Sequence, residues 1–447
     1  MPMSERCDAR PSEPPSRRTG ISATLAANEA LERKRREGVP VLPMAFGEAG
    51  LPVHPALRRE LADAAGRNGY GPVAGSPELR AAAAGYWTRR GLPTDPELVV
   101  AGPGSKALLF GLLLIIGGEV AVPQPSWVSY AAQAALTGAG ALFVPTRPDE
   151  GGVPDPELLA EAVRAARRRG RDVRSVVATL PDNPTGRLAG ESTVRRLCEV
   201  ARELDLLIIS DEIYRDLVHA SDETVSSPAL FAPERTVVTT ALSKHLAAGG
   251  WRLGVARLPE GAAGRALRAD LLGTASEIWS CAPAPIQRAA AYAFSEPPEL
   301  VEHVDRSRRL HAAVAGAVAA RFTAAGCRVP APQASFYVYP DFAPVADRLA
   351  EQGVRTGAEL AELLLDRYGV GTLPGSAFGE PAPALRLRVA TSLLYGESDE
   401  QRLAALEAED PVELPWIARS LDRLERVLSE VTAAEPVPAG AALSAVG

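Results

Sequence analysis

The chain has 447 residues, and its 48 lysines and arginines against 55 aspartates and glutamates give a formal net charge of −7. Its hydrophobic fraction is 46%, which is ordinary for a globular protein. A chain of this length accommodates two domains and buries enough core to fold without disulfides or a structural metal. The mild negative charge and the lack of a long basic block argue against nucleic acid as a partner.

The four cysteines are far apart, so they show no metal-binding spacing, and their pattern suits a reducing compartment. The most apolar run, residues 107–116, is too short to span a bilayer. Residues 1–20 are polar and lack the apolar core of a secretory signal. We therefore expect a cytoplasmic protein with no bound metal and no membrane contact, and we expect residues 1–20 and 433–447 to be disordered tails.

The first part of the chain alternates apolar β-type runs with segments of helical period. The runs at residues 175–180 and 206–210 are apolar almost throughout, as expected for strands that are covered on both faces. This alternation predicts an α/β fold, in which helices flank a mostly parallel sheet. The predicted strands are residues 98–101, 120–123, 142–145, 175–180, 206–210 and 236–240, and the predicted helices include residues 105–116, 156–169 and 192–204.

After about residue 299 the pattern changes. A long helical stretch is followed by a β-type run at residues 336–340, a helix at 356–368 and a second run at 385–390. Few strands separated by helices predict a smaller α+β domain. Residues 396–416 have the character of an insertion, and no role can be assigned to it. The predicted division is an N-terminal segment packing with the small domain (21–60), a large domain (61–300) and a small C-terminal domain (301–432).

Lysine is rare in this chain. Only Lys34, Lys106 and Lys244 occur, and the other 45 of the 48 basic residues are arginines. A lysine retained in such a background marks a place where arginine cannot serve, and arginine cannot form an imine. Lys244 follows a predicted strand and precedes Gly-Gly-Trp-Arg-x-Gly, in which the glycines permit close backbone approach and Arg252 suits a phosphate. A lone lysine is commonly just a solvated surface charge. The rarity of lysine in this chain and the surrounding motif together favour a chemical role for Lys244.

Three further motifs lie at a strand end or a helix start. Asn183, in Leu-Pro-Asp-Asn-Pro-Thr-Gly, follows a strand, although alone it fits a plain Asn-Pro turn. Asp211 ends a buried strand with Tyr214 three positions on, and it could cap a helix or hold a protonated pyridine nitrogen. Gly-Pro-Gly-Ser-Lys at residues 102–106 opens an apolar helix, whose free N–H groups can bind phosphate. Ligands of open α/β sheets bind beyond the carboxyl ends of the strands.

In this order, Asn-Pro-Thr-Gly, Ser-Asp-Glu-Ile-Tyr and Ser-Lys…Gly-Trp-Arg-x-Gly resemble the motifs of the class I/II, aspartate aminotransferase-like family. The resemblance spans roughly residues 45–392. It implies fold type I of the enzymes that depend on pyridoxal 5′-phosphate (PLP), a homodimer, and transfer of an amino group between an amino acid and a 2-oxo acid. It also implies that Lys244 holds the cofactor as a Schiff base and then shuttles a proton.

The resemblance implies further roles around the cofactor. Asp211 would pair with the pyridine nitrogen, Asn183 and Tyr214 would bind the ring hydroxyl, and Trp127 would stack on the ring. The phosphate would be surrounded by Gly104, Ser105, Lys106, Ser243 and Arg252, together with Tyr70 of the neighbouring subunit.

The substrate carboxylate would be held by Gly47 and Arg386, with Trp127 and Asn183 beside it. Arg386 and Arg388 are two positions apart on a predicted strand and so face the same side, and the residues alone do not choose between them. The family register, Arg-x-x-[Val/Phe]-Ala, selects Arg386. No second arginine can be placed for a side-chain carboxylate, so the motifs do not support specificity for dicarboxylates.

Two other functions are compatible with parts of this pattern. The same activating residues serve PLP enzymes that catalyse elimination, replacement, oxidation or ring formation, and motifs do not separate these from transamination. A PLP-sensing regulator would carry a DNA-binding module before the matching region. The roughly 40 residues there do not form a credible helix-turn-helix, so transamination is the leading interpretation.

Overall fold

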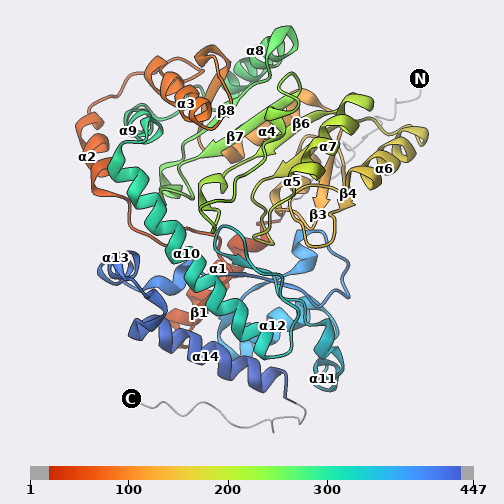
Figure 1. Cartoon of the computed structure of the whole chain (residues 1–447), viewed down its shortest axis with the longest axis vertical. Coiled ribbons are helices and arrows are strands. Elements are labelled where there is room, and N and C mark those ends of the chain that lie inside the picture. The colour runs from red at the N-terminus through yellow and green to blue at the C-terminus, as the bar shows by residue number, and fades with distance from the viewer. Residues whose placement is uncertain (1–19, 434–447) are drawn as a thin grey trace, which may run out of the picture.

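The computed structural model describes residues 20–433, so the two predicted tails lie outside the described residues except for Gly20 and Ala433. Its largest sheet has seven strands in the order β2-β8-β7-β6-β5-β3-β4 (Figure 1). Strand β8 is antiparallel to both of its neighbours, and the remaining pairs are parallel. The predicted α/β fold with a mostly parallel sheet is therefore confirmed. The strands are β2 (Val99–Gly102), β3 (Glu119–Gln124), β4 (Ala141–Pro145), β5 (Val173–Thr179), β6 (Leu207–Asp211), β7 (Thr236–Ala241) and β8 (Gly254–Arg257).

Helices cover both faces of this sheet, because successive residues of each strand point to opposite sides. On β5, Val176 packs in a core cluster with helices α6 and α7, whereas Val177 packs in another with α4, α5 and α8. A third cluster joins α2, α3 and α9 to β2, β7 and β8. These helices are α2 (Pro55–Ala64), α3 (Pro77–Arg89), α4 (Ser105–Ile116), α5 (Ser129–Leu136), α6 (Pro156–Arg168), α7 (Glu191–Glu203), α8 (Gly261–Ile278) and α9 (Ala284–Ser295).

The long helix α10 (Pro298–Ala324) leads from the large sheet to a smaller α+β part (Figure 1). This part contains an antiparallel sheet in the order β11-β12-β9 and a parallel pair, β1-β10. Its strands are β1 (Leu42–Pro43), β9 (Tyr337–Val338), β10 (Val370–Gly371), β11 (Leu373–Pro374) and β12 (Leu387–Ala390). Its helices are α11 (Ala346–Glu351), α12 (Gly357–Tyr368), α13 (Asp399–Glu407) and α14 (Pro415–Val431).

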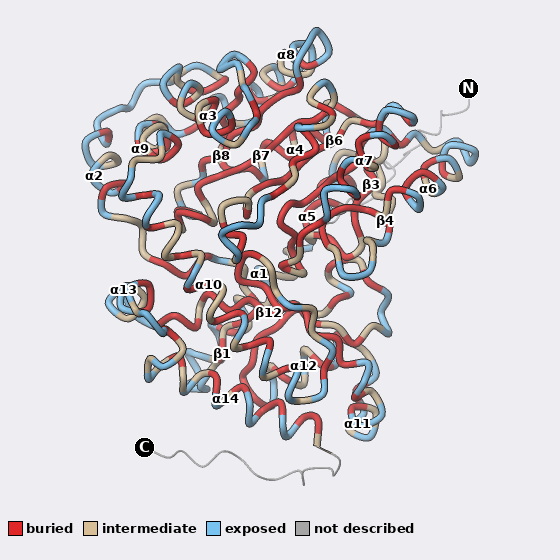
Figure 2. Tube along the Cα trace, viewed as in Figure 1, coloured by how far each residue is buried: buried red, intermediate tan, exposed pale blue. Residues whose placement is uncertain are grey.

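The N-terminal segment packs mainly with this smaller part. Helix α1 (Ala23–Arg36) buries Leu31 in a cluster with Leu373 and Phe378, and Leu42 and Met44 join a core formed by α10, α12 and α14. Figure 2 shows the buried strands and the exposed outer sides of the helices. Residues 396–416, which have the character of an insertion, contain α13. This helix buries Ala405 and Leu406 against the same core.

Among residues 20–433, no helix is long and apolar enough to cross a membrane. The same part of the chain holds no group of three or more His, Cys, Asp or Glu side chains placed to bind a metal ion.

Candidate active site

A cavity of about 530 Å³ lies where β5, β6 and β7 end, between the large sheet and the smaller part. Parallel strands bring their carboxyl ends to one edge, so motifs that are far apart in sequence meet there. The volume falls within the range of small-molecule sites. Ten of the predicted residues line it: Gly47, Ser105, Lys106, Trp127, Asn183, Asp211, Tyr214, Ser243, Lys244 and Arg252.

Lys244 follows β7, and its partly buried ammonium donates a hydrogen bond to the carbonyl oxygen of Gly47. Burial lowers the pKa of Lys244 to about 8, with the Arg388 charge acting in the same direction. Glu48 and Asp211 oppose this shift. A primary amine with a lowered pKa is available as a nucleophile near neutral pH.

Asp211 is the last residue of β6 and is almost completely buried. Its carboxylate accepts hydrogen bonds from the Tyr130 hydroxyl at 2.9 Å and the Thr239 hydroxyl at 3.3 Å. Burial raises the pKa of Asp211 to about 6, although these hydrogen bonds act against the rise. A buried carboxylate without an ion-pair partner within 4.0 Å among the described residues favours a cationic partner in the cavity.

Tyr214 meets a tyrosine that the motifs did not identify. Its hydroxyl lies 2.8 Å from the hydroxyl of Tyr337 on β9, and both side chains are buried. The Lys244 Nζ lies 5.7 Å from the centre of the Tyr214 ring. A Cβ at Gly47 would collide with the Tyr337 hydroxyl. Gly47 therefore allows the backbone to pass close to this tyrosine pair.

The other end of the cavity is cationic. Helix α4 begins after Gly104, which has a φ of 88°, and it presents Ser105 and Lys106 in its first turn. Burial and the nearby Arg252 both lower the pKa of Lys106. Two cations beside a helix N-terminus form a site for an anion. Gly104 lies against the Arg252 guanidinium, and Ser243 lines the cavity nearby.

The structure places the two candidate arginines in different surroundings. Arg386 lies outside the cavity, where its guanidinium binds Glu380 at 2.7 Å and Asp341 at 3.3 Å. Arg388 lies inside the cavity and is 1% exposed. It donates to Asn183 Oδ1 at 3.3 Å and to the Ala45 carbonyl oxygen. Positions two apart share a face but are roughly 6.6 Å apart along a strand, so only one of them reaches the cavity.

Tyr70 does not reach this cavity. Tyr70 is 92% exposed. Other lining residues were missed because they come from distant parts of the chain or carry no motif. They are Ser22, Thr24, Leu25, Phe46, Glu48, Tyr130, Thr179 and Tyr337. The cavity is also lined by Ile213, Gly249 and Gly250, which lie within the quoted motifs, and by Arg388.

Comparison with known proteins decides the family. The profile of the family described as aminotransferase class I and II matches residues 42–394. The chain belongs to the class I and II aminotransferases. Aspartate/prephenate aminotransferase of Thermus thermophilus is 33% identical to it over 401 residues, which cover 86% of this chain and 94% of that protein. Aspartate aminotransferase of Geobacillus stearothermophilus is 31% identical over 394 residues, covering 86% and 95% respectively.

A solved structure of aspartate aminotransferase from Thermus thermophilus with maleate is also similar to this aminotransferase. Its TM-score is 0.77 at 28% identity, over 91% of this chain and 97% of that chain. The matched fold confirms fold type I, and the family match confirms transamination of amino-acid substrates. Class I and II aminotransferases typically depend on PLP.

Proposed function

We propose that this aminotransferase binds PLP in the 530 Å³ cavity and transfers the amino group of a dicarboxylic amino acid to a 2-oxo acid. The residues fit the cofactor at three points. The α4 N-terminus with Ser105 and Arg252 suits the phosphate, and the buried Asp211 suits the pyridine nitrogen. The Lys244 amine suits the aldehyde carbon of the cofactor, with which it would form the Schiff base. When bound, PLP supplies a ring that accepts the electrons left on the substrate Cα.

The chain's own groups would then hold and move the proton. Asp211 would keep a proton on the pyridine nitrogen, because its carboxylate is buried and oriented by Tyr130 and Thr239. The Lys244 amine would act as the base that takes the proton from the substrate Cα and as the acid that returns it. Tyr214, held by Tyr337, and Asn183 would donate hydrogen bonds to the ring hydroxyl. Trp127 would pack over the ring and help to exclude water.

The observation that carries the proposal is the buried guanidinium of Arg388. It has no carboxylate within 4.0 Å among residues 20–433, and its Nε has no hydrogen-bond partner there. Burial lowers the pKa of Arg388, which is the cost of leaving a cation unpaired in the interior. A substrate carboxylate would complete this site with a bidentate pair.

Residues on the far side of the cavity support the proposal that the substrate carries a second anionic group. Lys106 Nζ lies 5.0 Å from the centre of the Trp127 ring, and Ser22 and Thr24 of the N-terminal segment line the same cavity. The Thr24 hydroxyl is buried without a hydrogen-bond partner among the described residues. A lysine can therefore take the place of the second arginine that the motifs lacked. The names of the relatives, and the maleate in the solved structure, point to the same class of substrate.

The test compares L-aspartate with L-alanine as donors to 2-oxoglutarate, by measuring glutamate formation. We expect aspartate to have the higher kcat/KM, and we expect Lys106→Met to reduce this preference about 10- to 150-fold, as loss of one charged hydrogen bond does. A loss of cofactor affinity would lower both rates equally and leave their ratio unchanged. Equal use of both donors by the unmodified enzyme would refute the dicarboxylate assignment.

We also propose that the enzyme is a homodimer in which Tyr70 contacts the phosphate in the neighbouring site. The 92% exposure of this large aromatic residue supports the proposal.

A further inference from the structure

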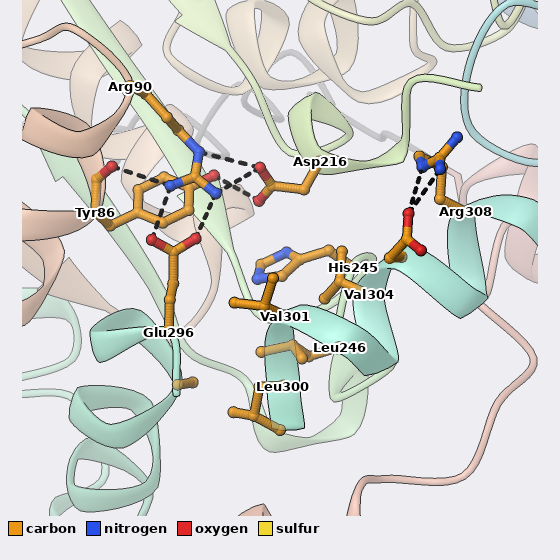
Figure 3. A pocket seen from close by; sticks show the side chains of 12 residues that line it. Tyr86, Arg90, Asp216, His245, Leu246, Glu296, Leu300, Val301, Val304 and Arg308 are labelled. Atoms are coloured by element: carbon orange, nitrogen blue, oxygen red, sulfur yellow. Dashed lines mark hydrogen bonds and ion pairs between the residues drawn. The ribbon is translucent and has the colours of Figure 1, made fainter. Parts of the chain in front are cut away.

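A second cavity, of about 230 Å³, lies behind the loop that follows β7, and it contains several carboxylates away from the active site. Asp216 and Glu296 accept hydrogen bonds from the Arg90 guanidinium at 2.7 and 2.5 Å (Figure 3). Asp305 pairs with Arg308 at 2.6 Å. Each carboxylate of this cavity therefore has a guanidinium partner.

Asp182 departs from this pattern. Among residues 20–433, the buried carboxyl groups are those of Asp182, Asp211, Glu212, Asp341 and Glu380. Guanidiniums lie within 4.0 Å of Glu212, Asp341 and Glu380. Asp211 lines the active-site cavity, whereas Asp182 is 0% exposed and does not line it. A buried acid without a cation is costly unless its hydrogen bonds are satisfied, so the role of Asp182 must be sought in those bonds.

The hydrogen bonds of Asp182 close the turn at residues 182–187. Its N–H donates to the Arg187 carbonyl oxygen at 3.0 Å, and its carbonyl oxygen accepts from the Gly186 N–H at 3.1 Å. Its Oδ2 accepts from the Thr185 hydroxyl at 2.5 Å and from the Thr185 N–H at 3.2 Å. Its Oδ1 has no partner among the described residues. Asp182 therefore ties the start of the turn to its middle and to its end.

Asn183, the next residue, carries this turn into the active site. Its side chain lines the cavity, and its Oδ1 accepts a hydrogen bond from Arg388 at 3.3 Å. The backbone at Gly151 packs closely on the turn, since a Cβ there would lie 2.5 Å from the Thr185 hydroxyl oxygen and 3.0 Å from Asp182 Oδ2. The direction of the Asn183 side chain is thus set by a turn that is closed and tightly packed.

We propose that Asp182 is a positioning residue, which closes this turn so that the Asn183 amide points at the ring hydroxyl of the cofactor while it accepts from Arg388. The inference rests on the proposed function, in which Asn183 binds that hydroxyl.

The surroundings of Asp182 indicate that it acts through hydrogen bonds rather than through charge. Burial raises the pKa of Asp182 to about 7, although the hydrogen bonds from Thr185 act against the rise. The titratable groups close enough to feel its charge are the hydroxyls of Tyr130 and Tyr339, and burial raises the pKa of both, so neither compensates a carboxylate. An asparagine has the shape of the uncharged acid and keeps an acceptor for the Thr185 donors. Asp182→Asn should therefore keep the turn closed, whereas Asp182→Ala should not.

The test is the pH midpoint at which the absorption band of bound PLP changes, a measurement that needs no turnover. Loss of the proton from the imine nitrogen leaves negative charge on the ring oxygen, so a donor to this oxygen lowers the midpoint. Asn183→Ala should raise the midpoint by roughly 1–2 pH units, which is the effect of losing one hydrogen bond to a charged group. Asp182→Ala should raise it by at least half as much, and Asp182→Asn should leave it unchanged.

Thr193→Val is the matched control. The Thr193 hydroxyl is buried and donates to the Glu150 carboxylate at 3.0 Å, and Thr193 does not line the active-site cavity. This variant loses the same kind of hydrogen bond, so it should lower the thermal stability without moving the midpoint. If Asp182→Ala does not fold, Thr185→Val decides, because it removes one donor to Asp182 and should raise the midpoint by a smaller amount.

The outcomes separate this inference from the proposed function. A raised midpoint in Asn183→Ala, with none in Asp182→Ala or Thr185→Val, would overturn the inference and leave the ring-hydroxyl contact standing. Equal shifts in Asp182→Ala and Thr193→Val would also overturn it, because general loosening of the fold would explain both. An unchanged midpoint in Asn183→Ala would refute the contact itself, and the inference with it.

Discussion

Arg388 and Arg386 are separated by one residue, yet they have different surroundings. The acids Glu380 and Asp341 bind Arg386, whereas Arg388 lies in the cavity without an acidic partner. A lysine at either position keeps the charge but loses the planar fork that holds a carboxylate at two points. Arg388→Lys should therefore lower kcat/KM for amino acids about 10- to 150-fold, and much less for amines that lack a carboxylate.

Arg386→Lys is the matched control for this measurement. It should affect both kinds of donor alike, because its change acts on the Glu380 ion pair outside the cavity. A carboxylate-selective loss in the Arg386 variant, with none in the Arg388 variant, would restore the register taken from the family resemblance.

The pKa of Lys244 gives a second prediction for single residues. Because this pKa is lowered from 10.5 to about 8, half of the amine should be deprotonated near pH 8 in the cofactor-free protein. Removing the like charge of Arg388 should raise the pKa of Lys244, so the Arg388→Met variant should hold less free amine at pH 8. The measurement is the pH profile of Lys244 modification by trinitrobenzenesulfonate, followed by peptide mass spectrometry.

Arg386→Met is the control, since the acids that bind Arg386 already neutralise its charge. Identical midpoints in the two methionine variants would show that Arg388 does not act on the lysine.

At the scale of elements, the packing of β8 against the start of α4 shapes the phosphate end of the cavity. A Cβ on Gly254 would clash with the Ser105 nitrogen and lie 2.7 Å from the Gly104 carbonyl carbon. Gly254→Ala should therefore displace the first turn of α4, destabilise the fold by about 1–3 kcal/mol and weaken PLP binding. Thermal unfolding and cofactor titration measure the two effects.

Gly273→Ala provides the comparison, because a Cβ on this residue of α8 would meet no atom within 4 Å. It should leave cofactor affinity unchanged. Unchanged PLP binding in the Gly254 variant would mean that this contact does not shape the site.

Elements with a strong local pattern could be predicted from the sequence. The apolar run of α4 is bounded by glycines, and the observed helix has the predicted limits, Ser105–Ile116. Strand β8 was missed because it has four residues and follows the motif loop without a separating turn signal. Tyr130 and Tyr337 were missed because their positions in the site depend on how α5 and β9 pack, which no local motif encodes.

For the whole molecule, the shared-site homodimer makes a complementation prediction. A heterodimer of Tyr70→Phe and Lys244→Ala chains would contain one site with both changes and one with neither. Its activity should therefore exceed that of either parent. Confirmed heterodimers without this gain would show that Tyr70 does not serve the neighbouring site.

The central claim, that Lys244 holds the cofactor, can be tested on the whole chain at once because only three lysines occur in it. Borohydride reduction of the cofactor-loaded enzyme, followed by peptide mass spectrometry, reads out which of them carries PLP. The account predicts a stoichiometric pyridoxyl label on Lys244 and none on Lys34 or Lys106. A label on Lys106 or Lys34 with Lys244 unmodified would contradict it.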